Sequence, residues 1–395
     1  MVEKYECTGC GACHDSCPVN AIEMRPDKEG FLYPIINFER CISCGVCERV
    51  CPVGKTYDEQ KNRPTVYAGR AKDKSIQMHS ASGGIFPLIA KHIIQQSGFV
   101  WGASFNDDYN VCHTFATNES ELGQLCRSKY VQSDLYGAYK NIKEQLKEGR
   151  LVLFTGTPCQ TSALASFIGN DLRKNLILVD VVCHGVPSPM IWREFLKELS
   201  DSQSEDSRNI SSISFKYKDS VRKWIHPGFR VVWRSGKEYL DYSNMSWYEN
   251  GYLGNLYVRP ACHSCRFKGL NSPSDLTIGD FWGCAEVMPE MYDEDGVSVL
   301  FSKTEKGAAL LLAIQSDMKY KEITLEEAIE HNARIVEPTA MNKNSIKFWK
   351  YYYTQSEKNL ENMGHIVQVC TRTGYYELLR CKIARLRRAL GRIKR

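Results

Sequence analysis

The sequence has 395 residues, of which 43% are hydrophobic and 25% are charged, and its formal net charge is +5. This length and composition are typical of a folded chain of two or three domains and exclude a small disulfide-rich secreted domain. Eight Lys and Arg residues lie in residues 380–395, which contain no acidic residue. The rest of the chain therefore carries +5 less 8, a net charge of −3, which argues against a general nucleic-acid-binding surface.

The chain shows no sign of an exported or membrane-spanning segment. No window holds eighteen consecutive apolar residues, and the first ten residues lack the apolar stretch of a signal peptide. We therefore expect a cytoplasmic protein, because thiols stay reduced there and metal clusters can be inserted.

Eight of the seventeen cysteines form two copies of one spacing near the amino terminus. Each copy reads C-x2-C-x2-C-x3-C followed by proline, the run of bacterial ferredoxins that hold two [4Fe-4S] clusters. In such proteins the fourth cysteine of each run ligates the other cluster. Zinc sites use pairs of cysteines instead of runs of four. The predicted ligand sets are Cys7, Cys10, Cys13 and Cys51 (the Cys7 set) and Cys41, Cys44, Cys47 and Cys17 (the Cys41 set).

The remaining pattern predicts a mixture of helices and strands. A turn at residues 27–30 joins two strand-like segments between the cysteine runs, which predicts a hairpin. Strands and helices then alternate, and this order indicates a partly parallel, mixed sheet with helices on its faces. The expected strands are 66–71, 99–105, 111–117, 151–156, 175–185, 210–218, 228–236 and 237–243, one ending near 283, and two more after 297. The expected helices include one from residue 85, one over 134–147, and helical segments toward 361.

A serine and two glycines precede the helix expected at residue 85. Ser82, Gly83 and Gly84 would leave free N–H groups at the positive end of the helix dipole, where a phosphate or pyrophosphate can bind. Serine and glycine are also favoured simply as helix caps. The pattern alone leaves both interpretations open.

Four later cysteines form a third possible ligand set, namely Cys159, Cys183, Cys262 and Cys265 (the Cys159 set). The first two are expected where strands end, at the edge where open α/β sheets bind ligands, and the other two form a CxxC pair. Four thiolates could hold a further [4Fe-4S] cluster or a structural zinc, and buried inert thiols are the third alternative. Spacing alone does not separate these three.

The order of several motifs resembles that of the coenzyme F-420 hydrogenase/dehydrogenase beta-subunit family. After the two ferredoxin runs come SASGG, RSKYVQS, GTPCQTSAL, VVCHGVPSP, RPACHSC and DLTIGDFWG, so the resemblance covers roughly residues 1–330. Members bind FAD with a [4Fe-4S] cluster beside it and exchange electrons with a hydride-accepting substrate. In archaeal members this substrate is the deazaflavin coenzyme, and plant and cyanobacterial relatives use reduced ferredoxin to reduce chlorophyll-type pigments.

The resemblance implies roles for particular residues. It implies that the Cys159 set holds a third [4Fe-4S] cluster and that His184 could donate a proton to flavin or substrate, although a histidine beside a cluster ligand more often only forms hydrogen bonds. The residues that it places at or near the FAD are Ser82, Gly83, Gly84, Lys129, Tyr130 and Thr157.

The predicted fold is therefore a multidomain α+β and α/β protein. Its predicted parts are a dicluster 4Fe-4S ferredoxin domain (1–55), a linker (56–65), an FAD-binding amino-terminal family domain (66–200), a carboxyl-terminal family domain with the CxxC pair (201–335) and a helical tail (336–395).

The predicted function is an iron–sulfur flavoprotein oxidoreductase that passes electrons from reduced ferredoxin through the clusters and FAD to an organic substrate. One alternative is oxidation or reduction of coenzyme F-420. Another, of a different class, is an electron-transfer subunit that has no substrate site of its own.

The last residues have the pattern of a basic amphipathic helix. Apolar residues recur every three or four positions between 379 and 393, eight cations occupy much of the rest, and two tyrosines stand at the start. This pattern is typical of binding to an anionic membrane surface, and docking on an acidic protein face is the alternative. A membrane-bound chain would suit a lipid-linked substrate, for example in cell-surface glycan assembly.

Removal of residues 375–395 is expected to release the protein from anionic vesicles without changing its visible absorption spectrum, because the cations are lost and the cluster ligands are kept. Co-sedimentation with anionic and with neutral vesicles measures this. Retained binding of the shortened chain to anionic vesicles would contradict the membrane interpretation.

Overall fold

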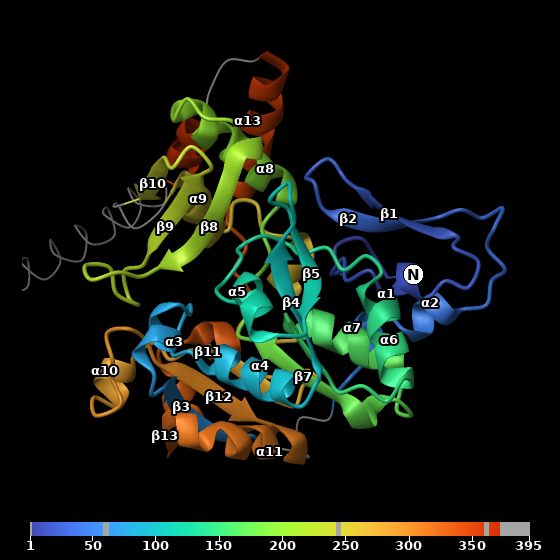
Figure 1. The fold of residues 1–395 in the computed structure, drawn as a ribbon. Helices are drawn as coiled ribbons and strands as arrows, with labels where there is room; N and C mark the ends of the chain where they lie inside the picture. Colours follow the sequence, from blue (N-terminus) through green and yellow to red (C-terminus); the bar gives the residue numbers. More distant parts are fainter. Residues whose placement is uncertain (1, 58–62, 242–245, 359–362, 372–395) are drawn as a thin grey trace, which may run out of the picture.

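The computed structural model describes residues 2–57, 63–241, 246–358 and 363–371. The chain forms an amino-terminal domain, a large mixed sheet with helices on both faces, and a smaller sheet that packs against further helices (Figure 1). The predicted α/β architecture with a ferredoxin-like amino-terminal domain is therefore confirmed.

The amino-terminal domain consists of two short helices and the predicted hairpin. The Asp27 carboxylate closes the hairpin turn by accepting hydrogen bonds from the N–H groups of Glu29 and Phe31. Gly11 and Gly45 precede the two helices with φ of 77° and 68°, a left-handed conformation that favours glycine. The elements are α1 (Ala12–Asp15), β1 (Ile22–Pro26), β2 (Leu32–Ile36) and α2 (Val46–Arg49).

The large sheet has eight strands in the order β13-β3-β12-β11-β7-β6-β4-β5. Strands β11, β7, β6 and β4 pair in parallel, and β12 lies antiparallel between β3 and β11. The carboxyl ends of β3, β11, β7, β6 and β4 therefore share one edge. The strands are β3 (Thr65–Ala71), β4 (Phe99–Phe105), β5 (Val111–Ala116), β6 (Val152–Gly156), β7 (Leu176–Val181), β11 (Leu276–Asp280), β12 (Ser298–Ser302) and β13 (Met318–Ile323).

Helices cover both faces of this sheet because successive strand residues point to opposite sides. Val100 packs with α4 and α11 on one face, whereas its neighbour Trp101 packs with α6 and α7 on the other. The predicted helix over 134–147 begins only at Ala138, since residue 134 pairs with the strand residue Cys112. The helices here are α3 (Lys74–Met78), α4 (Ile85–Gln95), α5 (Leu122–Leu125), α6 (Ala138–Lys147), α7 (Pro158–Ile168), α10 (Cys284–Val287), α11 (Glu305–Ile314) and α12 (Leu325–Ile329).

The smaller sheet, in the order β10-β9-β8, lies in the connection between β7 and β11. An aromatic core that includes Trp192, Phe215 and Tyr248 joins it to the surrounding helices. Because β11, β12 and β13 return to the large sheet, the division predicted at residue 200 does not separate two sheets. The elements are α8 (Pro189–Ser202), β8 (Ile210–Tyr217), β9 (Gly228–Trp233), β10 (Glu238–Asp241), α9 (Trp247–Leu253) and α13 (Ser345–Lys358), and residues 363–371 are also helical.

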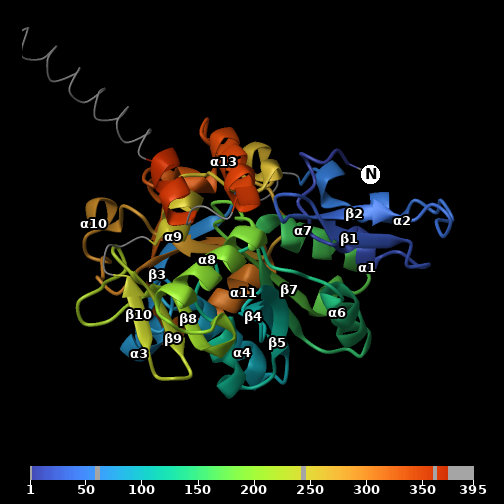
Figure 2. The same cartoon turned by 90° about the horizontal axis from the view of Figure 1, so that it is seen from above.

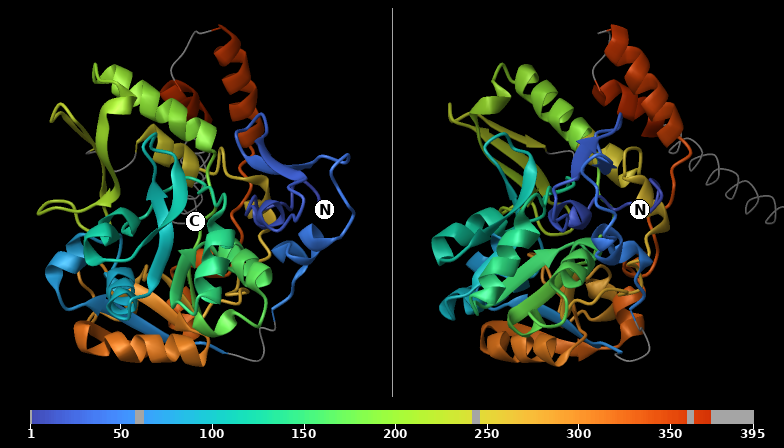
Figure 3. Two further views of the ribbon diagram at one scale, coloured as in Figure 1. Left: turned by 45° about the vertical axis from the view of Figure 1, so that its right-hand side comes forward. Right: turned by 90° about the vertical axis from the view of Figure 1, so that its right-hand side faces the viewer.

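The amino-terminal domain is held against the rest of the chain at several points. Helix α1 of the amino-terminal domain contacts α7 (Figure 2). The Lys28 carbonyl of the hairpin accepts a hydrogen bond of 3.0 Å from Tyr353 on α13, which stands above the hairpin (Figure 3). The Ser188 hydroxyl, which caps α8, also donates to the Glu29 carbonyl at 2.5 Å.

The predicted amphipathic helix at residues 375–395 lies outside the described residues. Within the ranges that are described, no helix combines the length and the apolar character that crossing a membrane requires.

Candidate cluster and cofactor site

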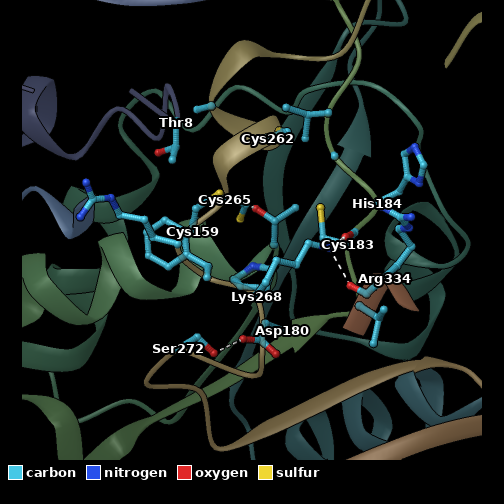
Figure 4. A pocket seen from close by; sticks show the side chains of 18 of the residues that line it. Thr8, Cys159, Asp180, Cys183, His184, Cys262, Cys265, Lys268, Ser272 and Arg334 are labelled. Atoms are coloured by element: carbon cyan, nitrogen blue, oxygen red, sulfur yellow. Dashed lines mark hydrogen bonds between the residues drawn. The ribbon is translucent and has the colours of Figure 1, made fainter. Parts of the chain in front are cut away.

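The Cys159 set surrounds a single pocket at the carboxyl edge of the large sheet (Figure 4). Cys159 follows β6 in the first turn of α7, and Cys183 follows the neighbouring strand β7. Cys262 and Cys265 come from the 3₁₀ turn Pro260–Ser264 and the residue after it, in the chain that returns toward β11. The topology thus brings together four thiols from three separate segments, as their positions at strand ends predicted.

The thiols of the Cys159 set lie close enough to influence one another's charge. The pKa of Cys159, Cys183 and Cys262 is raised to about 12, mainly by burial and in part by other thiols of the set. Burial also raises the pKa of Cys265, while the nearby Lys268 acts in the opposite direction. Binding of a metal centre would therefore have to displace their protons.

The hydrogen bonds around this pocket hold its loops in place. Thr157 caps α7, and its hydroxyl lies 3.1 Å from the Cys159 sulfur. The Lys268 ammonium donates to the carbonyl of Cys183 and, at 2.6 Å, to that of Arg334. These contacts fix the backbone on either side of the pocket.

His184 forms its side-chain contacts outside the group of thiols. Its Nε2 lies 2.7 Å from the Asn255 side-chain oxygen, its ring packs edge-on against Tyr252, and it points away from the thiols (Figure 4). Burial is the main cause that lowers its pKa. This geometry suits a residue that orients the loop after Cys183, and the predicted proton-donor role stays a prediction.

The Cys7 set lies next to the same pocket. Burial raises the pKa of Cys10 to about 12, and the charges of Cys7, Cys51 and Cys159 contribute to the increase. Cys10 is therefore a neighbour of two thiols of its own set and of Cys159 from the other set. The pocket is also lined by residues of the amino-terminal domain, namely Glu6, Thr8 and Val53. Grouping of Cys51 with the first run is the arrangement expected when the fourth cysteine is exchanged between runs. In the Cys41 set, Cys44 is exposed to solvent.

The loop of residues 82–84 lies at the same edge of the sheet, between β3 and α4. The Gly83 N–H donates to the Ser298 hydroxyl at 3.0 Å, and the Lys218 ammonium donates to the Ser82 carbonyl at 3.2 Å. A Cβ on Gly83 would lie only 2.7 Å from the Gly69 carbonyl oxygen. Glycine is therefore required here by close packing between neighbouring strands.

Arg127 binds the backbone shortly before this loop and has a side chain that could bind an anion. Its guanidinium donates to the carbonyls of His79 at 3.2 Å and Met78 at 3.4 Å. The remaining nitrogen, Nη1, is buried and has no hydrogen-bond partner among the described residues. A guanidinium with an unpaired N–H group fits the phosphate groups of a dinucleotide.

The other residues predicted to lie near FAD occupy different surroundings. The Lys129 ammonium donates to the carbonyls of Gln124 and Cys126, both at 2.7 Å, and burial lowers its pKa to about 7. The Tyr130 ring packs against Tyr252, at a centroid distance of 5.4 Å, and so lies between the pocket and the smaller sheet. Thr157 lies at the pocket, four strand positions from β3, a separation of about 19 Å at the usual strand spacing.

Comparison with protein-family models identifies two parts of the chain. Residues 149–328 match the carboxyl-terminal part of the coenzyme F420 hydrogenase/dehydrogenase beta subunit, and residues 6–55 match a 4Fe-4S dicluster domain. The chain thus combines a dicluster domain with a domain of the F420 hydrogenase/dehydrogenase beta-subunit family. Among solved structures, a chain of the F420-reducing [NiFe] hydrogenase complex from Methanosarcina barkeri aligns over 78% of this chain and 99% of its own, with 16% identity and a TM-score of 0.47. Comparison with curated proteins gave no match.

The family match confirms the resemblance that the motifs predicted and the iron–sulfur character of the amino-terminal domain. Residues 6–55 are therefore an iron–sulfur domain, and residues 149–328 are related to a subunit of an oxidoreductase family. The individual ligand assignments stay predictions.

Several charged residues of the site were not predicted from the motifs, although they lie in or beside them. Arg127 opens RSKYVQS, Arg259 opens RPACHSC, and Asp280 lies in DLTIGDFWG. Asp280 forms an ion pair with Lys216 and accepts a hydrogen bond of 2.9 Å from the Trp224 indole. Sequence position could have drawn attention to these residues, but their partners come from distant segments.

Replacement Gly83→Ala is expected to destabilise the sheet edge by about 1–3 kcal/mol, because the added methyl group would overlap the backbone of β3 and β12. Thermal unfolding measures the effect as a lower transition temperature. Gly123→Ala is the matched control, since a Cβ there meets nothing within 4 Å. Equal stability of the two variants would contradict the packing described.

Proposed function

We propose that this chain is an iron–sulfur flavoprotein oxidoreductase that passes electrons from reduced ferredoxin to an organic substrate. The observation that carries the proposal is that the Cys159 set forms one pocket, which residues of the dicluster domain also line. A third [4Fe-4S] cluster in this pocket would stand between the amino-terminal clusters and the rest of the sheet edge. The reductase direction and the identity of the donor are part of the proposal.

The donor set supports a cluster over a zinc ion. Four thiols and no histidine suit either centre, but a zinc ion needs its ligands to converge at about 2.3 Å. Across the described residues, no group of three or more His, Cys, Asp or Glu side chains is spaced to hold a single metal ion. The four thiols of the Cys159 set line one pocket, and we propose that a cluster occupies it.

The loop of residues 82–84 and Arg127 support binding of FAD. Gly83 keeps the loop close to the sheet edge, and the unpaired Nη1 of Arg127 could bind an anionic phosphate. Bound FAD would supply conversion between one-electron and two-electron chemistry. The rings of Tyr130 and Tyr252 pack against each other at an interplanar angle of 39°, and Tyr252 is buried.

Anaerobically purified protein should contain about twelve irons and one FAD per chain. Replacement Cys262→Ser should lower the iron content to about eight, because one thiolate of the Cys159 set is lost, and should leave the two amino-terminal clusters in place. Cys112→Ser is the matched control, since Cys112 lies on β5 outside the three sets. About eight irons with one zinc in the unmodified protein would contradict the third cluster, and clusters without stoichiometric FAD would favour an electron-transfer subunit.

Reduced ferredoxin is proposed to dock where the Cys41 set reaches the surface. Cys44 is exposed there, and the neighbouring Phe38 and Ile42 expose 81% and 60% of their surface. Exposed apolar side chains around a cluster ligand suit a partner that must approach closely without water between the two centres.

Replacements Phe38→Ala and Ile42→Ala are therefore expected to slow reduction by ferredoxin severalfold and to leave reduction by dithionite unchanged, because dithionite needs no docking surface. Stopped-flow absorbance measures both rates. Leu312→Ala, on α11, is the control with a similar exposure of 63%. Unchanged ferredoxin rates in both variants would exclude this docking site.

Coenzyme F420 is a second candidate substrate, favoured by the description of the matched family. Mixing the oxidised protein with reduced deazaflavin distinguishes the candidates: bleaching of the flavin supports F420, and an unchanged flavin spectrum supports another organic substrate. A lipid-linked or cell-surface glycan substrate and a peripheral membrane location rest on residues 375–395 and stay predictions.

A further inference from the structure

Arg259 is a fully buried arginine at the junction between the dicluster domain and the pocket of the Cys159 set. Its exposed fraction is 0%, and it lies three residues before Cys262. Its backbone carbonyl accepts the N–H of Cys262, so the residue is part of the loop that presents this thiol.

The guanidinium of Arg259 reaches into the amino-terminal domain and binds the loop of the Cys7 set. Nε donates to the Cys7 carbonyl at 2.7 Å, and Nη2 donates to the Leu32 carbonyl at 2.9 Å. Nη2 also lies 3.8 Å from the Cys7 sulfur, within the range of a weak N–H···S hydrogen bond. The Tyr33 ring lies 4.3 Å from the guanidinium carbon and adds a cation–π contact.

The loop fits tightly around this side chain. Gln132 accepts from Nη1 at 3.0 Å and itself donates to the Thr8 carbonyl at 3.2 Å. A Cβ on Gly9 would lie 2.5 Å from Nη1, and Gly9 has φ of 68°. The guanidinium is therefore held at a defined position beside the Cys7 sulfur.

The charge of Arg259 has no carboxylate partner within the described part of the chain, where its hydrogen-bond acceptors are carbonyl oxygens and the Cys7 sulfur. An isolated buried charge is costly unless an opposite charge lies nearby. Arg259 also lines the pocket that the Cys159 set surrounds. The groups that could balance it are thus thiolate centres on both sides.

We propose that Arg259 is a positioning residue that raises the reduction potentials of the centres held by the Cys7 set and by the Cys159 set. A cation and an N–H···S bond favour the more negative, reduced state of a cluster. The role involves no proton transfer and no bond cleavage, since one electron leaves one centre and arrives at the other. The part that concerns the Cys159 set rests on the proposed function.

The direct test is an anaerobic potentiometric titration followed by EPR. Arg259→Met should shift the midpoint potential of one amino-terminal cluster to a more negative value, and Arg259→Lys should shift it less because the charge is kept. The cluster of the Cys41 set serves as an internal reference and should not change. Arg266→Met is the comparison variant, because Arg266 pairs with Glu6 of the same domain but is exposed to solvent, which screens its charge.

A second variant keeps Arg259 and its packing. Gln132→Glu places a carboxylate of the same shape beside Nη1 and should also shift the potential to a more negative value, because it neutralises the guanidinium. This variant tests the inference even if Arg259→Met does not fold. Unchanged midpoint potentials in Gln132→Glu, or in folded Arg259→Met with full iron content, would overturn the inference.

The outcome is separable from that of the proposed function. A shift of one amino-terminal cluster in a protein that holds only about eight irons would reject the third cluster and keep the role of Arg259 toward the Cys7 set. About twelve irons with no shift in either variant would support the third cluster and reject the role of Arg259.

Discussion

The contact between the Arg259 guanidinium and the backbone of the amino-terminal cluster loop is the interaction on which the rest of the site depends. It connects the chain segment that carries Cys262 to the Cys7 carbonyl through a hydrogen bond of 2.7 Å and to the Leu32 carbonyl of the hairpin through one of 2.9 Å. Electron transfer slows steeply as the separation of two centres grows, so two cluster-binding loops can cooperate only when they are held at a fixed distance. A buried side chain that binds both loops meets this requirement.

Strand direction is the second constraint. Parallel strands β6 and β7 end at the same edge, so Cys159 and Cys183 become neighbours although 24 residues separate them in sequence. The smaller sheet is inserted after β7, and the chain brings the CxxC pair to the same edge as it returns to β11. The loop of residues 82–84 reaches this edge from β3. The sheet thus collects the cysteines and the candidate flavin site without any long-range sequence signal.

Local patterns predicted the parts of the molecule that local interactions determine. The cysteine spacing identified the dicluster domain, a turn with its capping aspartate marked the hairpin, and strand-end positions anticipated that Cys159 and Cys183 would meet. Contacts between distant segments were not accessible in this way. The return of β11 to β13 into the large sheet and the buried position of Arg259 each depend on tertiary packing, which no spacing or periodicity encodes.

The charges at the site follow a common arrangement. Cationic side chains come close to the expected anionic centres: Arg259 lies beside Cys7, Lys268 lies beside the Cys183 loop, and Arg127 binds the His79 carbonyl shortly before the loop of residues 82–84. Each is held mainly by backbone carbonyls, which fix its position without neutralising its charge. Such cations favour the binding of anionic cofactors and their reduction.

The central claim is that iron occupies the Cys159 set in line with the amino-terminal clusters. Anomalous diffraction at the iron absorption edge, from crystals grown without oxygen, tests it most directly. The account predicts three separate iron sites, one of them enclosed by Cys159, Cys183, Cys262 and Cys265. Iron at the two amino-terminal sites alone, with zinc or no metal among these four cysteines, would contradict it.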